Sequence, residues 1–217
     1  MDSSESLPVL NSIEIRVLGS LIEKSKTTPD YYPMTLNSLT AACNQKSSRK
    51  PVVQYDEETV VIALNALRKM GLTSTATGGT SRSVKYKHNF TLVFPLTTAE
   101  LAVMCLLFLR GPQTAGEINT NSARLHEFES LEEVLEVLEK LAHAEPPLVK
   151  QLPKRAGQKE VRYTHLLGES IALDEEELPE EPARKSVNEM EARLTIVEQE
   201  LAVMKESLEK LMKELMG

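Results

Sequence analysis

The sequence predicts a fold that is mainly α with small β-hairpins, an α+β chain in which one order of elements occurs twice before a final helix. Three observations predict it: the strands VKYKH and VRYTH share one pattern, the helices before them share their spacing, and a heptad repeat follows. Because five residues can match by chance, the prediction depends on whether the neighbouring elements also repeat.

The first helix of each half is marked by a capping box. The stretch NSIEIRVLGSLIEK begins with Asn11 and Glu14 at the required spacing, and TTAELAVMCLLFLR begins with Thr97 and Glu100 in the same way. Both stretches also place apolar residues on one helical face. The residues that match in register are Ile15, Leu18 and Ile22 in the first helix and Leu101, Met104 and Phe108 in the second.

Two further helices repeat. A short helical segment comes next in each half, TLNSLTAACN in the first and TAGEINTNSARLH in the second. A third helix follows, with Asp56 as its expected N-cap in the first half and Ser130 in the second. Its apolar stripe consists of Val60, Leu64 and Leu67 in the first half and of Val134, Leu138 and Leu141 in the second.

Each half ends in a predicted hairpin. The stretch MGLTSTATGGTSRSVKYKH indicates a strand, a turn at Gly78 and Gly79, and a second strand. The stretch PPLVKQLPKRAGQKEVRYTH indicates a strand, a loop and a strand that ends at His165. Three helices and a hairpin are the order of a winged helix, so we expect two tandem winged-helix domains, at residues 10–92 and 95–167.

The segment after these domains differs in kind. Residues 168–185 are rich in acids and contain prolines, which predicts a solvated linker. Residues 186–216 then follow the heptad pattern of a C-terminal coiled-coil helix, and Arg193 can meet Glu198 of a second copy in a parallel dimer. A helix that folds back on its own domains is the alternative. The residues expected to mediate dimerisation are Val187, Met190, Leu194, Val197, Leu201, Met204, Leu208, Leu211 and Leu215.

Alternation along the two matching stretches, VKYKH and VRYTH, separates a packing face from an outer face. In a strand, side chains alternate, which places Val84, Tyr86 and His88 on one side and Lys85 and Lys87 on the other. Packing against the helices explains the inner face, so we expect any functional contact from the outer one. In the second strand the inner residues are Val161, Tyr163 and His165, and the outer one is Arg162.

Composition and motifs exclude several classes of protein. The N-terminus MDSSESLPVL lacks the features of a signal peptide, so we expect a cytoplasmic protein. The longest apolar run, LAVMCLLFL, is far shorter than the roughly 20 residues of a membrane span and indicates a buried helix. Cys43 and Cys105 have no metal-ligand spacing and are interpreted as buried thiols. GxxxxGK and GxSxG are absent, so we expect no enzyme, metal or cofactor.

One stretch resembles a known family. The run TTPDYYPMTLNSLTAACNQKSSRKPV, residues 27–52, is similar to the hallmark of the YceH family of bacterial proteins, above all at ACNQK and at the Arg49, Pro51 and Val52 that follow. The resemblance covers nearly the whole chain. It implies two winged-helix domains joined to a C-terminal helix, and it implies no established activity.

Basic residues are concentrated locally, although the net charge of −7 argues against a surface built throughout for polyanions. Residues 44–90 hold eight Lys and Arg against three Asp and Glu, and residues 148–165 hold five against one. Such side chains neutralise phosphates. The candidate nucleic-acid-binding residues are Lys46, Arg49, Lys50, Arg82, Lys85, Lys87, Lys150, Lys154, Arg155, Lys159 and Arg162.

Two functions remain open. The first is a DNA-binding, transcription-regulator-like protein. It would contact the backbone of double-stranded DNA through the loop that holds Lys46, Arg49 and Lys50 and through the two hairpins, which are the wings of the winged helices. Against it, the helix expected to enter the major groove begins with Asp56, Glu57 and Glu58, and its counterpart carries Glu132 and Glu133. These acids repel phosphates but complement the helix dipole. The second function is a protein–protein interaction scaffold, similar to condensation-complex accessory proteins with tandem winged helices, and the acidic turns favour it.

Overall fold

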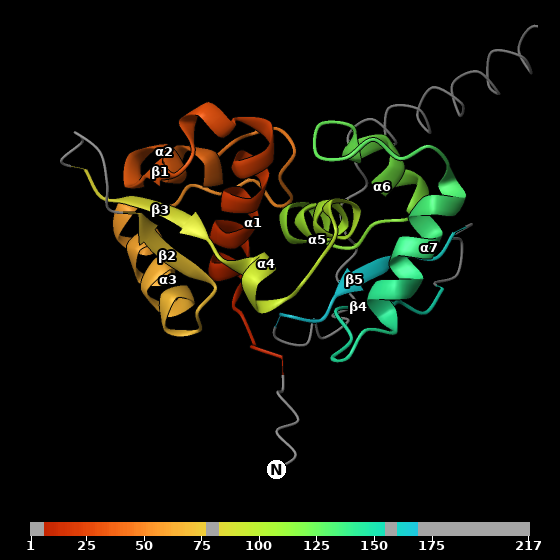
Figure 1. Cartoon of the computed structure of the whole chain (residues 1–217). Helices are drawn as coiled ribbons and strands as arrows, with labels where there is room; N and C mark the ends of the chain where they lie inside the picture. Colours follow the sequence, from red (N-terminus) through yellow and green to blue (C-terminus); the bar gives the residue numbers. More distant parts are fainter. Residues whose placement is uncertain (1–6, 77–82, 155–159, 169–217) are drawn as a thin grey trace, which may run out of the picture. The chain divides into compact units, whose positions relative to one another are not determined.

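A computed structural model describes residues 7–76, 83–154 and 160–168, all within one compact unit of residues 1–171 (Figure 1). This part contains seven α-helices and two small antiparallel sheets, which confirms the predicted α+β class. The predicted coiled-coil helix, residues 186–216, lies outside the described residues, as does all of the predicted linker except residue 168.

Both halves follow one order of elements, three helices and then a hairpin. The first half consists of α1 (Ser12–Thr27), η1 (Pro29–Tyr31), β1 (Met34–Thr35), α2 (Leu36–Cys43), α3 (Glu57–Lys69), β2 (Thr73–Ala76), β3 (Lys85–His88) and α4 (Phe90–Val93). The second half consists of α5 (Thr98–Arg110), α6 (Ala115–Ser122), α7 (Leu131–Ala142), β4 (Val149–Gln151) and β5 (Tyr163–His165).

The predicted capping boxes are confirmed. Asn11 Oδ1 accepts a hydrogen bond from the Glu14 backbone N–H at 2.9 Å, and Glu14 Oε2 accepts one from the Asn11 N–H at 2.9 Å. Thr97 and Glu100 form the same reciprocal pair at the start of α5. Each box satisfies two backbone donors that the first turn of a helix leaves without a partner.

The third helices also begin and pack as expected. Asp56 caps α3 by accepting from the Thr59 N–H, and Ser130 caps α7 by accepting from the Glu133 N–H. Their predicted apolar stripes are buried, which places α3 and α7 against the core of their own halves.

The two matching stretches, VKYKH and VRYTH, contain β3 and β5, which occupy equivalent places in two hairpins. β3 pairs antiparallel with β2, with His88 opposite Thr73, and β5 pairs antiparallel with β4, with His165 opposite Val149. Both predicted hairpins are thereby confirmed, although the predicted Gly78–Gly79 turn lies outside the described residues.

The element β1 was not predicted. Its residue Met34 pairs with Tyr86, which makes β3 the central strand of a three-stranded sheet. In the second half an isolated bridge joins Gln113 to Tyr163 at the equivalent place. In both halves a threonine that caps the next helix follows directly, so the repeat includes this pairing as well.

The alternation expected along the strands holds only in part. Val84 precedes β3 and is 52% exposed, so the expectation that it packs inward is wrong. Tyr86 does pack against the core, and His88 is half-buried. In β5 both Thr164 and His165 are buried, because α5 and the N-terminal segment enclose the end of this strand.

The two ends of the described unit meet. Leu10 forms a parallel bridge with Gly168, and the Leu10 N–H donates a hydrogen bond to the Leu167 carbonyl oxygen at 2.8 Å. Both leucines are fully buried. The first and last described segments therefore share one edge of the core.

Helices α1 and α5 cross at the centre of the unit (Figure 1). Gly19 permits their close approach, because an added Cβ would lie 3.0 Å from Phe108 Cβ and 3.0 Å from Leu109 Cδ2. Cys105 Sγ lies 3.5 Å from the Gly19 carbonyl oxygen. Since Gly19 follows the N-cap Asn11 by the same interval as Cys105 follows Thr97, equivalent positions of the two halves meet there.

The core is continuous across both halves. Every residue of α5 from 101 to 109 is buried, as the run LAVMCLLFL indicated. Cys43 and Cys105 are buried free thiols, which confirms their interpretation. In the described part, no helix combines the length and the apolar character that a membrane crossing requires.

Substitution of Gly19 by leucine is expected to lower the free energy of unfolding by about 2 kcal/mol or more, because the added side chain overpacks the helix crossing. Denaturant titration measures the change. Gly116→Leu is the matched control, since Gly116 is also helical and its added Cβ would have 3.9 Å of room. Comparable stability of the two variants would show that the crossing tolerates a larger separation.

His88 and His165, which occupy equivalent positions in the two hairpins, predict that the fold loses stability in acid. The pKa values of His88 and His165 are both lowered from 6.5 to about 4, by burial in each case and, for His88, also by the charge of Lys26. The unfolded chain therefore binds more protons than the folded one between these pH values, so stability is full above about pH 6.5 and falls as pH drops toward about 4.

His165→Asn should flatten this acid dependence, by about 3 kcal/mol between about pH 7 and pH 4 at most. Unfolding titrations at the two pH values measure it. His143→Asn, at an exposed position, should leave the dependence as it is in the wild type. A slope that is the same in all three proteins would show that His165 is protonated in the folded state.

Candidate nucleic-acid interface

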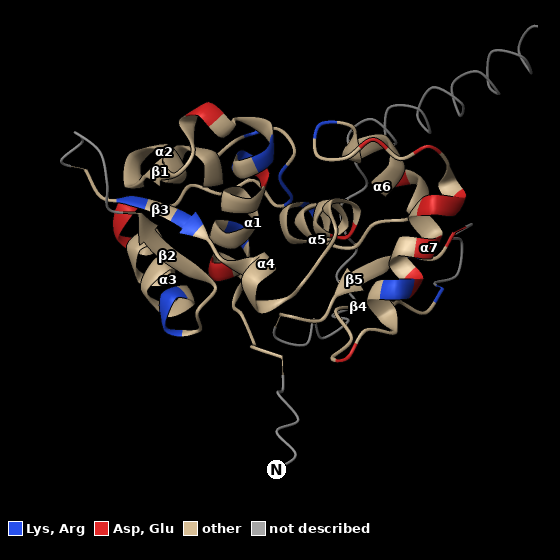
Figure 2. Ribbon diagram, viewed as in Figure 1, with Lys and Arg blue, Asp and Glu red and all other residues tan. Residues whose placement is uncertain are grey.

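The first hairpin presents two lysines on one face of β3. Lys87 is exposed and Lys85 half-buried, and both point away from the core side of the sheet. The residues paired with them are Thr35, Ala76 and Ser74, none of which carries a charge. Figure 2 shows the basic positions on β3. This face is therefore basic without a neutralising acid at the paired positions.

Arg49 does not face solvent, so its prediction as a phosphate contact is corrected. Its side chain is fully buried, and its guanidinium donates to both Glu23 carboxylate oxygens, from Nη1 at 3.0 Å and from Nη2 at 2.6 Å. Nε and Nη2 also donate to the Ala42 carbonyl oxygen, at 3.2 and 3.1 Å. With its donors used inside the chain, Arg49 anchors the loop.

Glu23 is the counter-ion that allows this burial. Burial raises the pKa of Glu23, but the hydrogen bonds and the charge of Arg49 outweigh it, so the pKa lies below its ordinary value. The carboxylate is thus ionised at neutral pH. Arg16 adds a second buried anchor by donating to the carbonyl oxygens of Cys43 at 3.1 Å and Pro51 at 2.6 Å. Two internal arginines therefore hold the loop of residues 44–50.

The loop keeps two lysines outside these anchors. Lys46 is exposed and Lys50 half-buried. The Lys50 backbone N–H donates to the Leu109 carbonyl oxygen at 2.8 Å, which joins the loop to the end of α5. Lys46 is consequently the loop residue best placed to meet an external anion.

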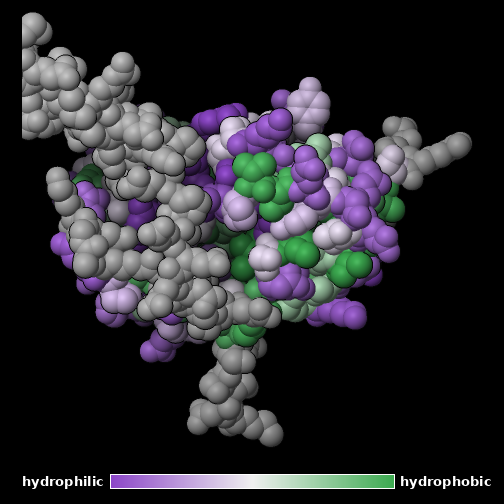
Figure 3. All heavy atoms as spheres, turned by 180° about the vertical axis from the view of Figure 1, so that it is seen from behind, coloured by the Kyte–Doolittle hydropathy of each residue, from purple (hydrophilic) through white to green (hydrophobic). Residues whose placement is uncertain are grey.

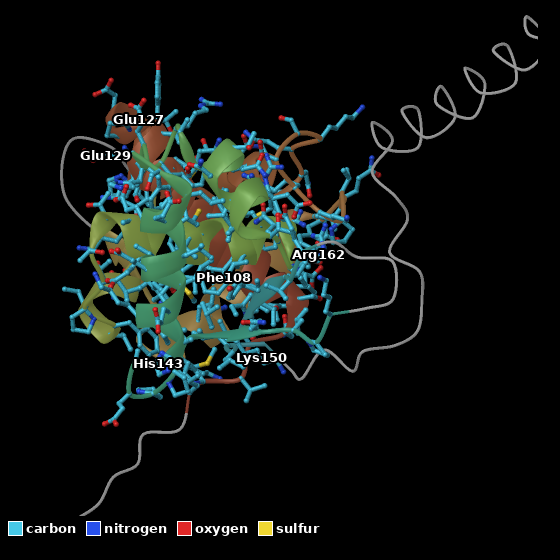
Figure 4. The ribbon with its side chains drawn as sticks, turned by 90° about the vertical axis from the view of Figure 1, so that its right-hand side faces the viewer. Phe108, Glu127, Glu129, His143, Lys150 and Arg162 are labelled. Atoms are coloured by element: carbon cyan, nitrogen blue, oxygen red, sulfur yellow. The ribbon has the colours of Figure 1, made fainter. Side chains whose placement is uncertain are left out.

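The second hairpin divides its basic residues between surface and interior contacts. Lys150 and Lys154 are exposed, whereas Arg162 donates to both Glu117 carboxylate oxygens, at 2.9 and 2.8 Å, and to the Pro112 carbonyl oxygen at 2.8 Å. Arg162, expected on the outer face of the second strand, is half-buried and already pairs with Glu117. Figure 4 shows Arg162 and Lys150 at different heights of this side of the unit. Three further candidates, Arg82, Arg155 and Lys159, lie outside the described residues.

The acidic first turns are exposed, as predicted. Asp56, Glu57 and Glu58 all face solvent at the start of α3. The Asp56 carboxylate accepts the Thr59 N–H, and hydrogen bonds from the Thr59 side chain and backbone lower the pKa of Asp56. Along α7 the acidic positions predominate (Figure 2). The exposed faces of α3 and α7 would therefore repel a phosphate backbone at their N-terminal ends.

Sequence reasoning missed one basic site. A cleft of about 450 Å³ lies where α1, α5 and α6 end beside the loop of residues 44–50. Four basic side chains line it, and three of them come from helix ends that are far apart in the sequence. The sequence does place basic residues near three helix C-termini, but it does not show that these helix ends lie close together in the fold. The basic residues are Lys24, Lys46, Arg110 and Arg124.

Metal binding finds no support in the part of the chain that the structure describes. Residues 7–76, 83–154 and 160–168 contain no group of three or more His, Cys, Asp or Glu side chains that could hold an ion. The chemistry available here is therefore cationic and hydrogen-bonding.

Comparisons with known proteins give a family without an activity. The family described as "Protein of unknown function, DUF480" matches residues 10–158. A "UPF0502 protein" of Opitutus terrae is 51% identical over 179 residues, 82% of this chain and 78% of the relative. Proteins of the same name from Shewanella loihica and Solibacter usitatus are 44% and 46% identical, covering 90% and 92% of this chain and 94% and 95% of their own lengths.

Removal of the Arg49 side chain is expected to act on stability. Arg49→Met should lower the free energy of unfolding by about 3 kcal/mol, because it leaves the Glu23 carboxylate buried without its counter-ion. Lys46→Met, an exposed substitution in the same loop, should change it by less than about 0.5 kcal/mol. Denaturant titration compares them, and Arg49→Met combined with Glu23→Gln should regain part of the loss. Equal stability of the two single variants would refute the anchoring role.

Proposed function

The chain belongs to the DUF480 family, and because the description of that family assigns no activity, we propose from its own residues that it binds double-stranded DNA by the phosphate backbone. In this proposal each half is a winged helix, and the protein is a non-enzymatic, regulator-like factor of the cytoplasm. In this proposal the predicted C-terminal coiled-coil helix, residues 186–216, joins two copies of the chain.

The winged-helix assignment rests on the repeated order of three helices and a hairpin. In such a domain the hairpin is the wing, and a wing contacts backbone beside the helix that enters a groove. The three-stranded sheet of the first half holds its wing on a central strand, β3, which is hydrogen-bonded on both sides. A rigid strand presents its side chains in a constant geometry, which favours a repeated contact with regularly spaced phosphates.

The observation that carries the proposal is the pair of lysines on β3. Lys85 and Lys87 lie two residues apart on one face, so their Cα atoms are separated by about 7 Å. One strand of DNA carries one charge per about 3.4 Å of helix axis, so two cations about 7 Å apart can both lie against the phosphates of one backbone. Uncharged paired residues leave both cations available.

The acidic turns decide how DNA would approach. Asp56, Glu57 and Glu58 oppose insertion of the α3 N-terminus into a groove, because each carboxylate would approach the phosphates without a counter-ion. A contact made by the two β3 lysines avoids that cost. We therefore expect binding that depends strongly on salt and weakly on base sequence.

A protein–protein scaffold is the second candidate, and α7 favours it. Leu131 and Leu135 are each 42% exposed, and acidic residues surround them on the same helix. Figure 3 shows hydrophobic side chains in small groups among polar ones on the described part of the rear face. An acidic surface that also exposes leucine side chains suits a basic protein partner better than DNA.

Lys85→Glu combined with Lys87→Glu is expected to weaken binding to all DNA duplexes alike, because phosphate contacts carry no base information. Fluorescence anisotropy with duplexes of several sequences, at two salt concentrations, measures the affinity. The logarithmic salt slope should fall by about 0.9 for each phosphate that the variant no longer neutralises.

Lys140→Glu is the control, since it makes one such Lys→Glu exchange at an exposed position of α7. It should leave the affinity near the wild-type value. Loss of affinity for one duplex alone would contradict backbone binding. Wild-type protein that fails to bind any duplex at low salt would reject the DNA proposal in favour of the scaffold.

A further inference from the structure

The cleft between the loop of residues 44–50 and the ends of α1, α5 and α6 has the charge of an anion site. Glu23 is the one acid among the described residues that line it, and Arg49 already binds both oxygens of that carboxylate. Lys24 shares the same acid, because its ammonium lies 3.2 Å from Glu23 Oε2. Lys24, Lys46 and Arg124 therefore stand against a single carboxylate whose charge Arg49 already balances.

Helix dipoles oppose an anion here, but they are too weak to decide the sign. Three helices direct their C-terminal ends at the cleft, and each such end carries about half a negative charge at most. The chain also reduces this term, since the Lys24 and Leu109 carbonyl oxygens accept from the N–H groups of Thr28 and Lys50. The three cations Lys24, Lys46 and Arg124 outweigh three half-charges, so the potential in the cleft stays positive.

The neutral residues of the cleft add donors and an apolar floor. Ser47, Ser48 and Asn121 supply hydroxyl and amide groups, and the Arg110 guanidinium donates to Ser48 Oγ at 3.1 Å. Leu106 and Leu109 form a buried base to the same cleft. A polar rim over an apolar base fits a ligand that is charged at one end and apolar or planar at the other.

Ser48 has the backbone conformation of a residue held in place. Its φ of +58° lies in the left-handed region that non-glycine residues seldom adopt. The buried Arg49 that follows it accounts for the constraint, because its fixed position determines the path of the chain through the loop. The rim of the cleft is thus ordered before any ligand arrives, which reduces the entropy cost of binding.

We propose that this cleft binds a small molecule that carries two adjacent phosphate groups and an apolar or planar moiety, such as a nucleoside diphosphate. Three cations, Lys24, Lys46 and Arg124, exceed what one phosphate requires, and the volume of about 450 Å³ is that of a small-ligand pocket. The leucine base takes the uncharged moiety. The site is separate from the β3 lysines and does not depend on the DNA proposal.

Isothermal titration of the full-length protein with ADP, with inorganic pyrophosphate and with adenosine tests the proposal. ADP should bind most tightly, pyrophosphate more weakly and adenosine weakest, because the cations recognise the phosphates and the leucines add apolar contact. Lys46→Gln combined with Arg124→Gln, both at exposed positions, should weaken ADP binding at least tenfold. Lys140→Gln on α7 should leave it unchanged.

Wild-type protein that binds neither ADP nor pyrophosphate overturns the proposal, as does equal weakening by the cleft variant and by Lys140→Gln. Loss of DNA affinity in the cleft variant, without any ADP binding by the wild type, would assign the cleft to DNA phosphates and also overturn it. ADP binding that survives Lys85→Glu with Lys87→Glu separates this site from the DNA surface, whatever becomes of the DNA proposal.

Discussion

The close crossing of α1 and α5 is the constraint on which the described unit depends. Gly19 removes the side chain that would separate the two helices, and Cys105, its equivalent in the second half, is the residue that meets it. Neither half buries its first helix alone, because each uses the other half's first helix as its core. This explains why every residue of α5 from 101 to 109 is buried.

Much of the fold could be predicted because its signals are local. The capping boxes at Asn11 and Thr97, the N-caps of α3 and α7, and the hairpins depend on residues a few positions apart, and the structure confirms them. Strand β1 could not be predicted, because a two-residue strand exists only through its pairing with β3, more than forty residues away. Val84 was placed wrongly because alternation fails where a strand has not yet begun.

The candidate site was harder to predict for an electrostatic reason. A sequence counts Arg49, Arg162 and Lys46 as equal cations, but only tertiary contacts decide which of them already has a partner. Arg49 and Arg162, which both lie outside helices, each form a two-point ion pair with a glutamate on a helix, whereas Lys46 is exposed. A block of positive charge therefore overstates the surface available to an external anion.

The contact between Leu10 and Leu167 also bears on how the chain could have been assembled. When the first and last described residues of a unit are neighbours, the order in which its halves are translated stops being a structural requirement. Joining residue 168 to residue 10 and opening the exposed connection at Pro95 would preserve every pairing within each half. The two halves are thus joined twice, once by the chain itself and once by the Leu10–Gly168 bridge.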